Sequence, residues 1–133
     1  VRLLPACAPE HIWDCLCGAD LFAFTSYREG MPNSLLEAMA MGVPAVAFAI
    51  PSVLELDGGQ GAVLTVPPFD ASLLAEAILR LLNSPAERGQ LGEQGKARIL
   101  ERYMVKDNMA TALESLARLR ALPPCSPRRG HRR

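Results

Sequence analysis

Short, continuous apolar runs separate segments of helical periodicity in the first half of this 133-residue chain. Runs that are apolar at consecutive rather than alternating positions are typical of strands covered on both faces. Strands are predicted in this way at residues 1–4, 21–25, 45–49 and 62–66, and short helices at residues 9–17 and 34–41. The repeated strand–helix–strand order predicts an α/β fold, in which right-handed crossovers build a parallel sheet with helices on both faces.

Helical periodicity dominates the chain after Asp70. This residue is placed to cap a helix that runs to about residue 82, because apolar residues recur there at the spacing of one helix face. The sequence from Ser84 to Glu87 combines a capping box with proline at the first helical position, and it predicts a helix to about residue 103. Glycines at positions 89, 92 and 95 weaken that helix and allow a break in it. A last helix is predicted over residues 106–119.

Residues 1–122 are predicted to form one domain, because the proline pair at 123–124 ends the helical pattern. Residues 123–133 are polar, basic and rich in proline, so a disordered basic tail is predicted there. The tail holds Arg128, Arg129, Arg132 and Arg133, and the remaining 10 basic residues face 14 acidic ones. This mildly acidic balance argues against a nucleic-acid partner of the folded part, whereas weak peripheral contact of the tail with an anionic membrane or RNA stays an alternative.

The cysteines do not have the spacing of a metal site. Cys15 and Cys17 are one residue apart on a predicted helix, so their side chains point in different directions. No paired Cys-x-x-Cys spacing occurs, and His11 and His131 have no nearby ligand partner, so we expect Cys7, Cys15, Cys17 and Cys125 to be reduced thiols in the cytoplasm. No apolar run of roughly 20 residues is present, so no transmembrane segment is predicted.

The most informative segment is residues 29–44, which places two carboxylates on either side of a helix start. Glu29 precedes the Pro-Asn-Ser start of the predicted helix, and Glu37 is expected in its first turn. A helix N-terminus has unpaired amides and a partial positive charge that suit an anion such as a diphosphate. Carboxylates on either side can accept hydrogen bonds from hydroxyl groups, so the pattern fits a nucleotide sugar.

The residues around these carboxylates carry a family resemblance. The sequence Ala-Asp-Leu-Phe-Ala-Phe-Thr-Ser at 19–26, followed by residues 29–47, closely resembles the C-terminal domain of group 1 (family 4) retaining glycosyltransferases of the GT-B fold. The specific part is the pair of glutamates with seven residues between them, within Gly-x-Pro-Asn-x-x-x-Glu-Ala-Met-Ala-x-Gly-x-Pro. Weaker matches at Glu55, at residues 57–61 and in the later helices extend the resemblance to roughly residues 1–118.

The resemblance implies a Rossmann-like donor-nucleotide domain and a role for each residue of the motif. Glu29 is implied as the catalytic residue, which holds a hydroxyl of the donor sugar near the reacting carbon, and Glu37 as the acceptor for the ribose diol. Backbone amides around residues 31–33 would contact sugar hydroxyls, and those of Ser34 and Leu35 would contact phosphate. The implied donor-binding set is Glu29, Gly30, Met31, Pro32, Asn33, Ser34, Leu35 and Glu37. No metal or other cofactor is implied, since the nucleoside diphosphate sugar is a substrate.

Each of these residues also has a purely structural explanation. Ser34-Leu35-Leu36-Glu37 matches a capping box, in which Glu37 would bond the Ser34 amide. Glu29 could be a solvated loop carboxylate, and the Gly, Pro and Asn residues could serve the turn alone. A loop is predicted after the strand at 45–49, and the chain departs from many relatives there, since it has Ile50-Pro51-Ser52 where those carry a Gly-Gly pair.

The resemblance therefore implies part of a glycosyltransferase that moves a hexose from a nucleoside diphosphate sugar to an unknown acceptor with retention. In the resembled family an N-terminal acceptor domain and a basic pair that grips the diphosphate precede this region, and neither occurs in this sequence. The chain looks like the latter part of a larger enzyme, so we expect little or no transfer by it alone. The alternatives are a nucleotide-sugar epimerase of the same fold and a non-catalytic nucleotide-binding remnant.

Overall fold

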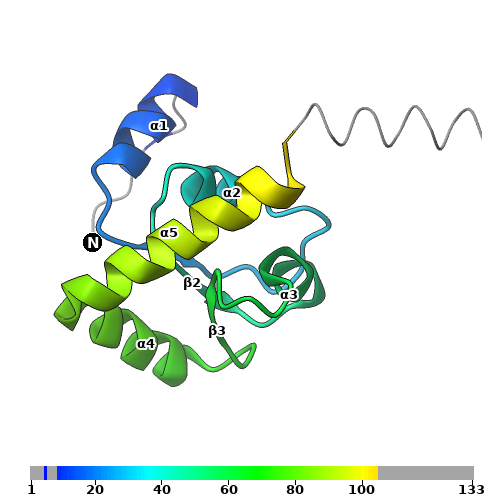
Figure 1. Cartoon of the computed structure of the whole chain (residues 1–133). Coiled ribbons are helices and arrows are strands. Elements are labelled where there is room, and N and C mark those ends of the chain that lie inside the picture. Colours follow the sequence, from blue (N-terminus) through cyan, green and yellow to red (C-terminus); the bar gives the residue numbers. More distant parts are fainter. Residues whose placement is uncertain (1–4, 6–8, 105–133) are drawn as a thin grey trace, which may run out of the picture. The chain divides into compact units, whose positions relative to one another are not determined.

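The structure is a computed structural model that describes residue 5 and residues 9–104. It divides the chain into two units, Val1–Arg102 and Tyr103–Arg133, and nearly all of the described residues belong to the first. The elements of that unit follow in the order α1 (Pro9–Cys17), β1 (Phe22–Phe24), α2 (Asn33–Ala40), β2 (Ala45–Phe48), α3 (Pro51–Asp57), β3 (Leu64–Val66), α4 (Ala71–Asn83) and α5 (Pro85–Arg102) (Figure 1). The strand predicted at residues 1–4, the helix predicted at 106–119, the domain boundary near residue 122 and the basic tail lie outside the described residues.

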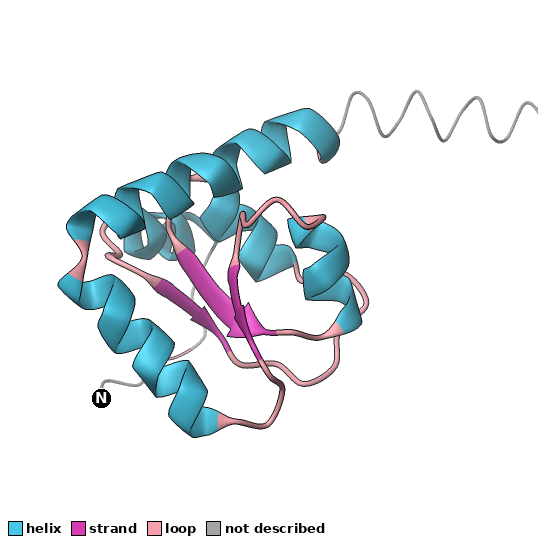
Figure 2. Cartoon of the chain, turned by 60° about the horizontal axis from the view of Figure 1, so that its bottom comes forward, coloured by secondary structure: helices cyan, strands magenta, loops and turns pink. Residues whose placement is uncertain are grey.

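The three strands form a parallel sheet in the order β1-β2-β3, which confirms the predicted α/β class. Phe22 is opposite Ala45, and Val46 is opposite Leu64. In Figure 2 the strands lie in the middle of the unit with helices around them, and their arrowheads point the same way. All four residues of β2 are buried, as expected for a central strand that is covered on both faces.

Helix α2 connects β1 to β2 and carries Leu35, Ala38 and Met39 into the core. Its helical hydrogen bonds start one residue earlier than predicted, because the Pro32 carbonyl accepts from the amides of Leu35 and Leu36, both at 3.0 Å. The helix ends where the sequence indicates. Gly42 adopts a φ of 77°, and this left-handed conformation lets the chain turn directly into β2.

Helix α3 is missing from the sequence prediction, which placed a loop after β2. Two helix signals were present: Pro51 occupies the first turn, and Gly58 ends the helix with a φ of 61°. The strand predicted at 62–66 is shorter than expected because the Asp57 carboxylate accepts from the amides of Ala62 (2.6 Å) and Val63 (3.0 Å). Those two residues are therefore tied to the end of α3 rather than to the sheet.

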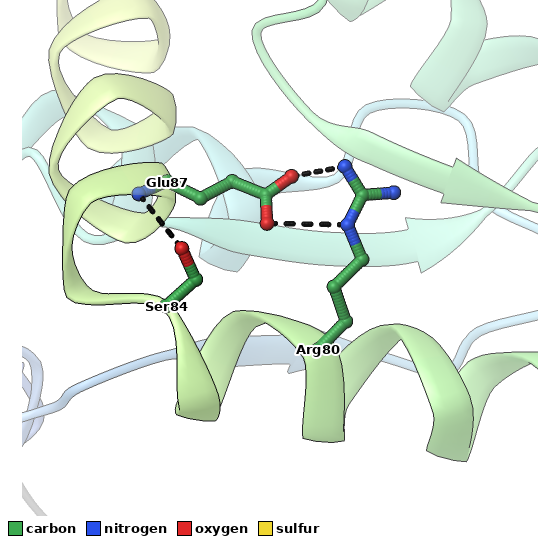
Figure 3. Close-up of polar contacts among 3 residues, drawn as sticks. All are labelled: Arg80, Ser84 and Glu87. Carbon is green, nitrogen blue, oxygen red and sulfur yellow. Dashed lines mark hydrogen bonds and ion pairs between the residues drawn. The ribbon is translucent and has the colours of Figure 1, made fainter.

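The predicted caps of α4 and α5 are present. The Asp70 carboxylate accepts from the Leu73 amide at 2.9 Å, and the Ser84 hydroxyl accepts from the Glu87 amide at 3.4 Å. The Glu87 side chain does not complete a capping box, since it forms a two-pronged ion pair with Arg80 of α4 (Figure 3). The hydrogen bond and charge of Glu87 raise the pKa of the Arg80 guanidinium above its ordinary value.

Helix α5 is continuous, so the break that its glycines allowed does not occur. Gly92 and Gly95 are buried at a close contact rather than at a bend. A Cβ on Gly92 would overlap the carbonyl oxygen of Gly42, and one on Gly95 would lie 3.2 Å from the carbonyl oxygen of Ala62. Both glycines therefore let α5 lie directly on the turn that follows α2 and on the loop before β3.

The core of the unit lies between the sheet and these helices. Its largest fully buried side chains are those of Leu35, Met39, Leu56, Leu81, Val46 and Val53. In the region that the structure describes, every helix is too short or too polar to serve as a membrane span.

Candidate functional site

The predicted site residues lie in the loop that leaves β1 and in the first two turns of α2. The carboxyl ends of parallel strands meet at one edge of the sheet, and ligands of open α/β sheets bind at this edge. β1 ends at Phe24, and the loop then runs through the exposed residues Glu29, Gly30 and Met31 to the buried Pro32. The structure thus places Glu29 and the start of α2 at the edge where a ligand is expected.

Glu29 and Glu37 are both exposed, and within residues 9–104 neither side chain makes a hydrogen bond or an ion pair. The capping-box explanation of Glu37 is wrong. Helix α2 has Pro32 at its N-cap and no side-chain cap, so Glu37 is the fifth helical residue and lies beyond the first turn that was predicted for it. Both carboxylates are therefore available to a ligand.

The backbone at the start of α2 is more fully paired than the sequence suggested. The amides of Leu35 and Leu36 donate to the Pro32 carbonyl, and the Asn33 amide donates to the Met31 carbonyl at 3.0 Å. The Ser34 amide is the first-turn donor for which the described chain supplies no backbone acceptor. Of the two amides assigned to phosphate by resemblance, that of Ser34 is available and that of Leu35 is already engaged.

Glu37 lines a hollow of about 350 Å³ together with Trp13, Ala40 and Met41. The Trp13 side chain comes from α1 and is 49% exposed, so it presents an aromatic surface beside the carboxylate. α1 is attached here by packing of Leu16 against Ala38 and Val43. Sequence reasoning did not include Trp13, because nothing in the spacing of α1 and α2 indicates which of their faces meet.

Tyr27 is a second residue near the site that the sequence did not single out. Its ring stacks between Phe48, with ring centroids 5.2 Å apart, and Phe69, with centroids 4.4 Å apart. Tyr27 follows β1, Phe48 ends β2 and Phe69 follows β3, so the three rings come together at the carboxyl edge of the sheet. In residues 9–104 no cluster of His, Cys, Asp and Glu has the size and spacing to hold a metal ion.

The site lies within the part of the chain that matches a known family. The model of the family described as "Glycosyl transferases group 1" matches residues 1–84, which include the Glu29 loop and all of α2. Among curated proteins, the chain is 36% identical to the MMP alpha-(1->4)-mannosyltransferase of Mycolicibacterium hassiacum over 95 residues, which are 69% of this chain and 23% of that protein. It is 31% identical to the D-inositol 3-phosphate glycosyltransferase of Corynebacterium jeikeium over an alignment that covers 99% of this chain and 30% of that protein.

A solved structure agrees with the sequence matches. Sucrose-phosphate synthase from Thermosynechococcus elongatus superposes with a TM-score of 0.72 at 31% sequence identity, over 83% of this chain and 27% of that one. The chain thus spans less than a third of the length of each of these proteins. The match to the family model, the curated relatives and the shared fold show that the chain belongs to the group 1 glycosyltransferases of the GT-B fold.

Proposed function

We propose that this chain is the donor-binding part of a glycosyltransferase that transfers a hexose from a nucleoside diphosphate sugar to an acceptor, with retention of configuration. The observation that carries the proposal is the pair of unpaired carboxylates, Glu29 and Glu37, on either side of the start of α2. They lie at the ligand-binding edge of a parallel sheet, inside the region matched by the family.

Glu37 is proposed to bind the nucleoside. Its carboxylate can accept two hydrogen bonds from the ribose diol, and the half-exposed Trp13 lines the same hollow. Stacking of a nucleobase on an aromatic side chain contributes about 1–3 kcal/mol. A carboxylate beside an aromatic surface therefore matches the polar and the apolar part of a nucleoside.

The start of α2 is proposed to bind the diphosphate. The available Ser34 amide can donate to a phosphate oxygen, and the positive end of the helix dipole favours the negative charge of the leaving group. The backbone of Gly30, Met31, Pro32 and Asn33 would lie along the sugar, while the Leu35 amide contributes through the helix dipole because it already donates to Pro32.

Glu29 is proposed to act on the donor sugar. Its carboxylate would accept a hydrogen bond from a ring hydroxyl and hold the reacting carbon in place. Positive charge develops on that carbon as the bond to the diphosphate breaks, and a preorganised negative group stabilises it. The acceptor would be bound mostly by protein outside this chain, so the chain alone is expected to transfer little or no sugar.

A binding screen on the full chain tests the proposal. Saturation-transfer NMR with uridine, guanosine and adenosine diphosphates and their hexose conjugates should detect weak binding of at least one pair. Glu37→Ala should reduce the signal, whereas Glu93→Ala, which removes an exposed carboxylate from α5, should not.

The same screen separates the alternatives. If no nucleotide binds the folded chain, the proposal is wrong. If a bound nucleotide sugar changes configuration without an acceptor, the epimerase alternative replaces it. The rest of a relative's sequence can also be joined to this chain. If nucleotide binds but neither the chain nor the fusion turns over a nucleotide sugar, the non-catalytic remnant is favoured.

A further inference from the structure

The part of the loop on either side of Glu29 lacks polar contacts with the rest of the described unit. Residues 26–30 make no backbone or side-chain hydrogen bond with any other part of the described chain. An exposed loop with so few contacts is expected to be mobile. A catalytic carboxylate, however, has to be held within a fraction of an ångström of its productive position. Something other than hydrogen bonding must therefore hold this loop.

The Tyr27 side chain supplies the contact that the backbone lacks. Its ring lies between those of Phe48 and Phe69, with interplanar angles of 16° and 15°. Phe48 is only 2% exposed and belongs to the central strand, so it fixes one end of the stack to the core. Tyr27 is two residues before Glu29, so the stack holds the loop next to the carboxylate.

The outer ring of the stack is held at a cost in backbone energy. Phe69 has a φ of 67°, and it is the one non-glycine residue in the described ranges with a positive φ. Its side chain is 73% exposed, so burial of the ring in the core does not explain this strained conformation. Strained residues of this kind cluster at functional sites, where the surrounding structure maintains them. The feature that accompanies the strain here is the contact with Tyr27.

We propose that Phe48, Tyr27 and Phe69 form an aromatic brace that orders the Glu29 loop, with Tyr27 and Phe69 as positioning residues. Each of the three parallel strands or its following loop contributes one ring at the carboxyl edge of the sheet. The ordering of the loop does not depend on the proposed function. Its consequence for the donor sugar does, because it rests on the role of Glu29.

The ordering is measured by ¹⁵N relaxation of the full chain. Parent backbone order parameters at Glu29 and Gly30 should be near 0.8, and those of Tyr27→Ala should fall below about 0.6. Tyr27→Phe keeps the ring and should keep the parent values. Leu79→Ala removes an exposed apolar side chain from α4 and serves as the control, for which no change at residues 28–31 is expected.

Phe69→Gly distinguishes a brace from ordinary packing. Glycine adopts a φ of 67° without strain, so the variant should unfold at the same temperature as the parent or higher. The order parameters of Glu29 and Gly30 should nevertheless fall. A variant that loses stability while the loop stays ordered would overturn the proposal, as would unchanged order parameters in Tyr27→Ala.

Ligand affinity then tests the consequence for the site. Because Glu29 is assigned to the sugar, Tyr27→Ala should lower the affinity for a nucleoside diphosphate hexose about threefold more than that for the nucleoside diphosphate, a difference on the scale of one hydrogen bond. Tyr27→Phe should restore the parent ratio. If neither ligand binds the parent chain, the proposed function fails while the order parameters still decide the brace. If Tyr27→Ala lowers the order parameters of the loop but leaves the ratio of the two ligand affinities unchanged, the link between the brace and Glu29 is overturned.

Discussion

Two loops of this unit satisfy their polar groups in opposite ways. The loop after α3 is built around the buried Asp57, whose carboxylate accepts from the amides of Gly59, Ala62 and Val63 at 2.6–3.1 Å. Arg98 of α5, also buried, donates from Nε to the Leu56 carbonyl at 2.9 Å. The loop after β1 has no such bond between residues 26 and 30, and its carboxylate at Glu29 is exposed.

Asp57 stabilises the fold through its hydrogen bonds, whereas Glu29 is proposed to bind a ligand. A buried carboxylate that accepts three amide hydrogen bonds cannot bind anything else without breaking the loop. An exposed carboxylate with no partner contributes little to folding, and the proposed function assigns Glu29 to the donor sugar.

Asp57→Ala should destabilise the unit most. The change leaves three amides without their charged acceptor, two of them buried, and we expect a loss of about 3–4 kcal/mol in the free energy of unfolding. Denaturant titration followed by circular dichroism measures it. Asp14→Ala removes an exposed carboxylate from α1 and should shift the same curve by less than about 0.5 kcal/mol. Equal small effects of both changes would contradict the structural role of Asp57.

Two glycines of α5 should respond to alanine with opposite signs. Gly92→Ala places a Cβ against the Gly42 carbonyl and should destabilise the unit by about 1–3 kcal/mol. Gly89 is exposed and has no atom near the added Cβ, so Gly89→Ala should stabilise the helix by about 0.5–1 kcal/mol. Thermal unfolding of the two variants checks this, and shifts of the same sign would show that α5 does not lie on the turn after α2 as described.

The sequence was most informative where structure depends on neighbouring residues. The consecutive apolar runs and the Pro-Asn-Ser helix start predicted β1, α2 and β2 in the correct order and orientation. The short helix α3 was missed because seven residues show little periodicity and a proline after a strand resembled a loop. The sequence could not exclude a break in α5, because Gly92 and Gly95 serve contacts with residues far away in the sequence, Gly42 and Ala62.

The candidate site likewise contains residues that the sequence could predict and residues that it could not. Glu29 and Glu37 were identified from a contiguous motif, and the structure leaves both available. The aromatic brace could not be predicted, because Tyr27, Phe48 and Phe69 come from three different parts of the chain and meet only through the strand order. The position of Trp13 beside Glu37 likewise depends on how α1 packs.

Substitutions of the two free carboxylates should leave stability nearly unchanged. Neither side chain has a partner in the described unit, so Glu29→Gln and Glu37→Ala should each alter the free energy of unfolding by no more than about 0.5 kcal/mol. The measurement is the same denaturant titration used for Asp57→Ala. A loss above about 1 kcal/mol in either variant would place that glutamate with Asp57 among the structural residues.

The central claim is that Glu29 and Glu37 bind different parts of one ligand, the sugar and the nucleoside. Calorimetry of the full chain tests it most directly. Dissociation constants are measured for a nucleoside diphosphate and for its hexose conjugate, with the parent, Glu29→Gln, Glu37→Ala and the control Glu93→Ala. Glu37→Ala should weaken both ligands about tenfold, because hydrogen bonds to the ribose are lost in each case. Glu29→Gln should weaken only the hexose conjugate, by a smaller factor. Unchanged constants for both ligands in both folded variants would contradict the account.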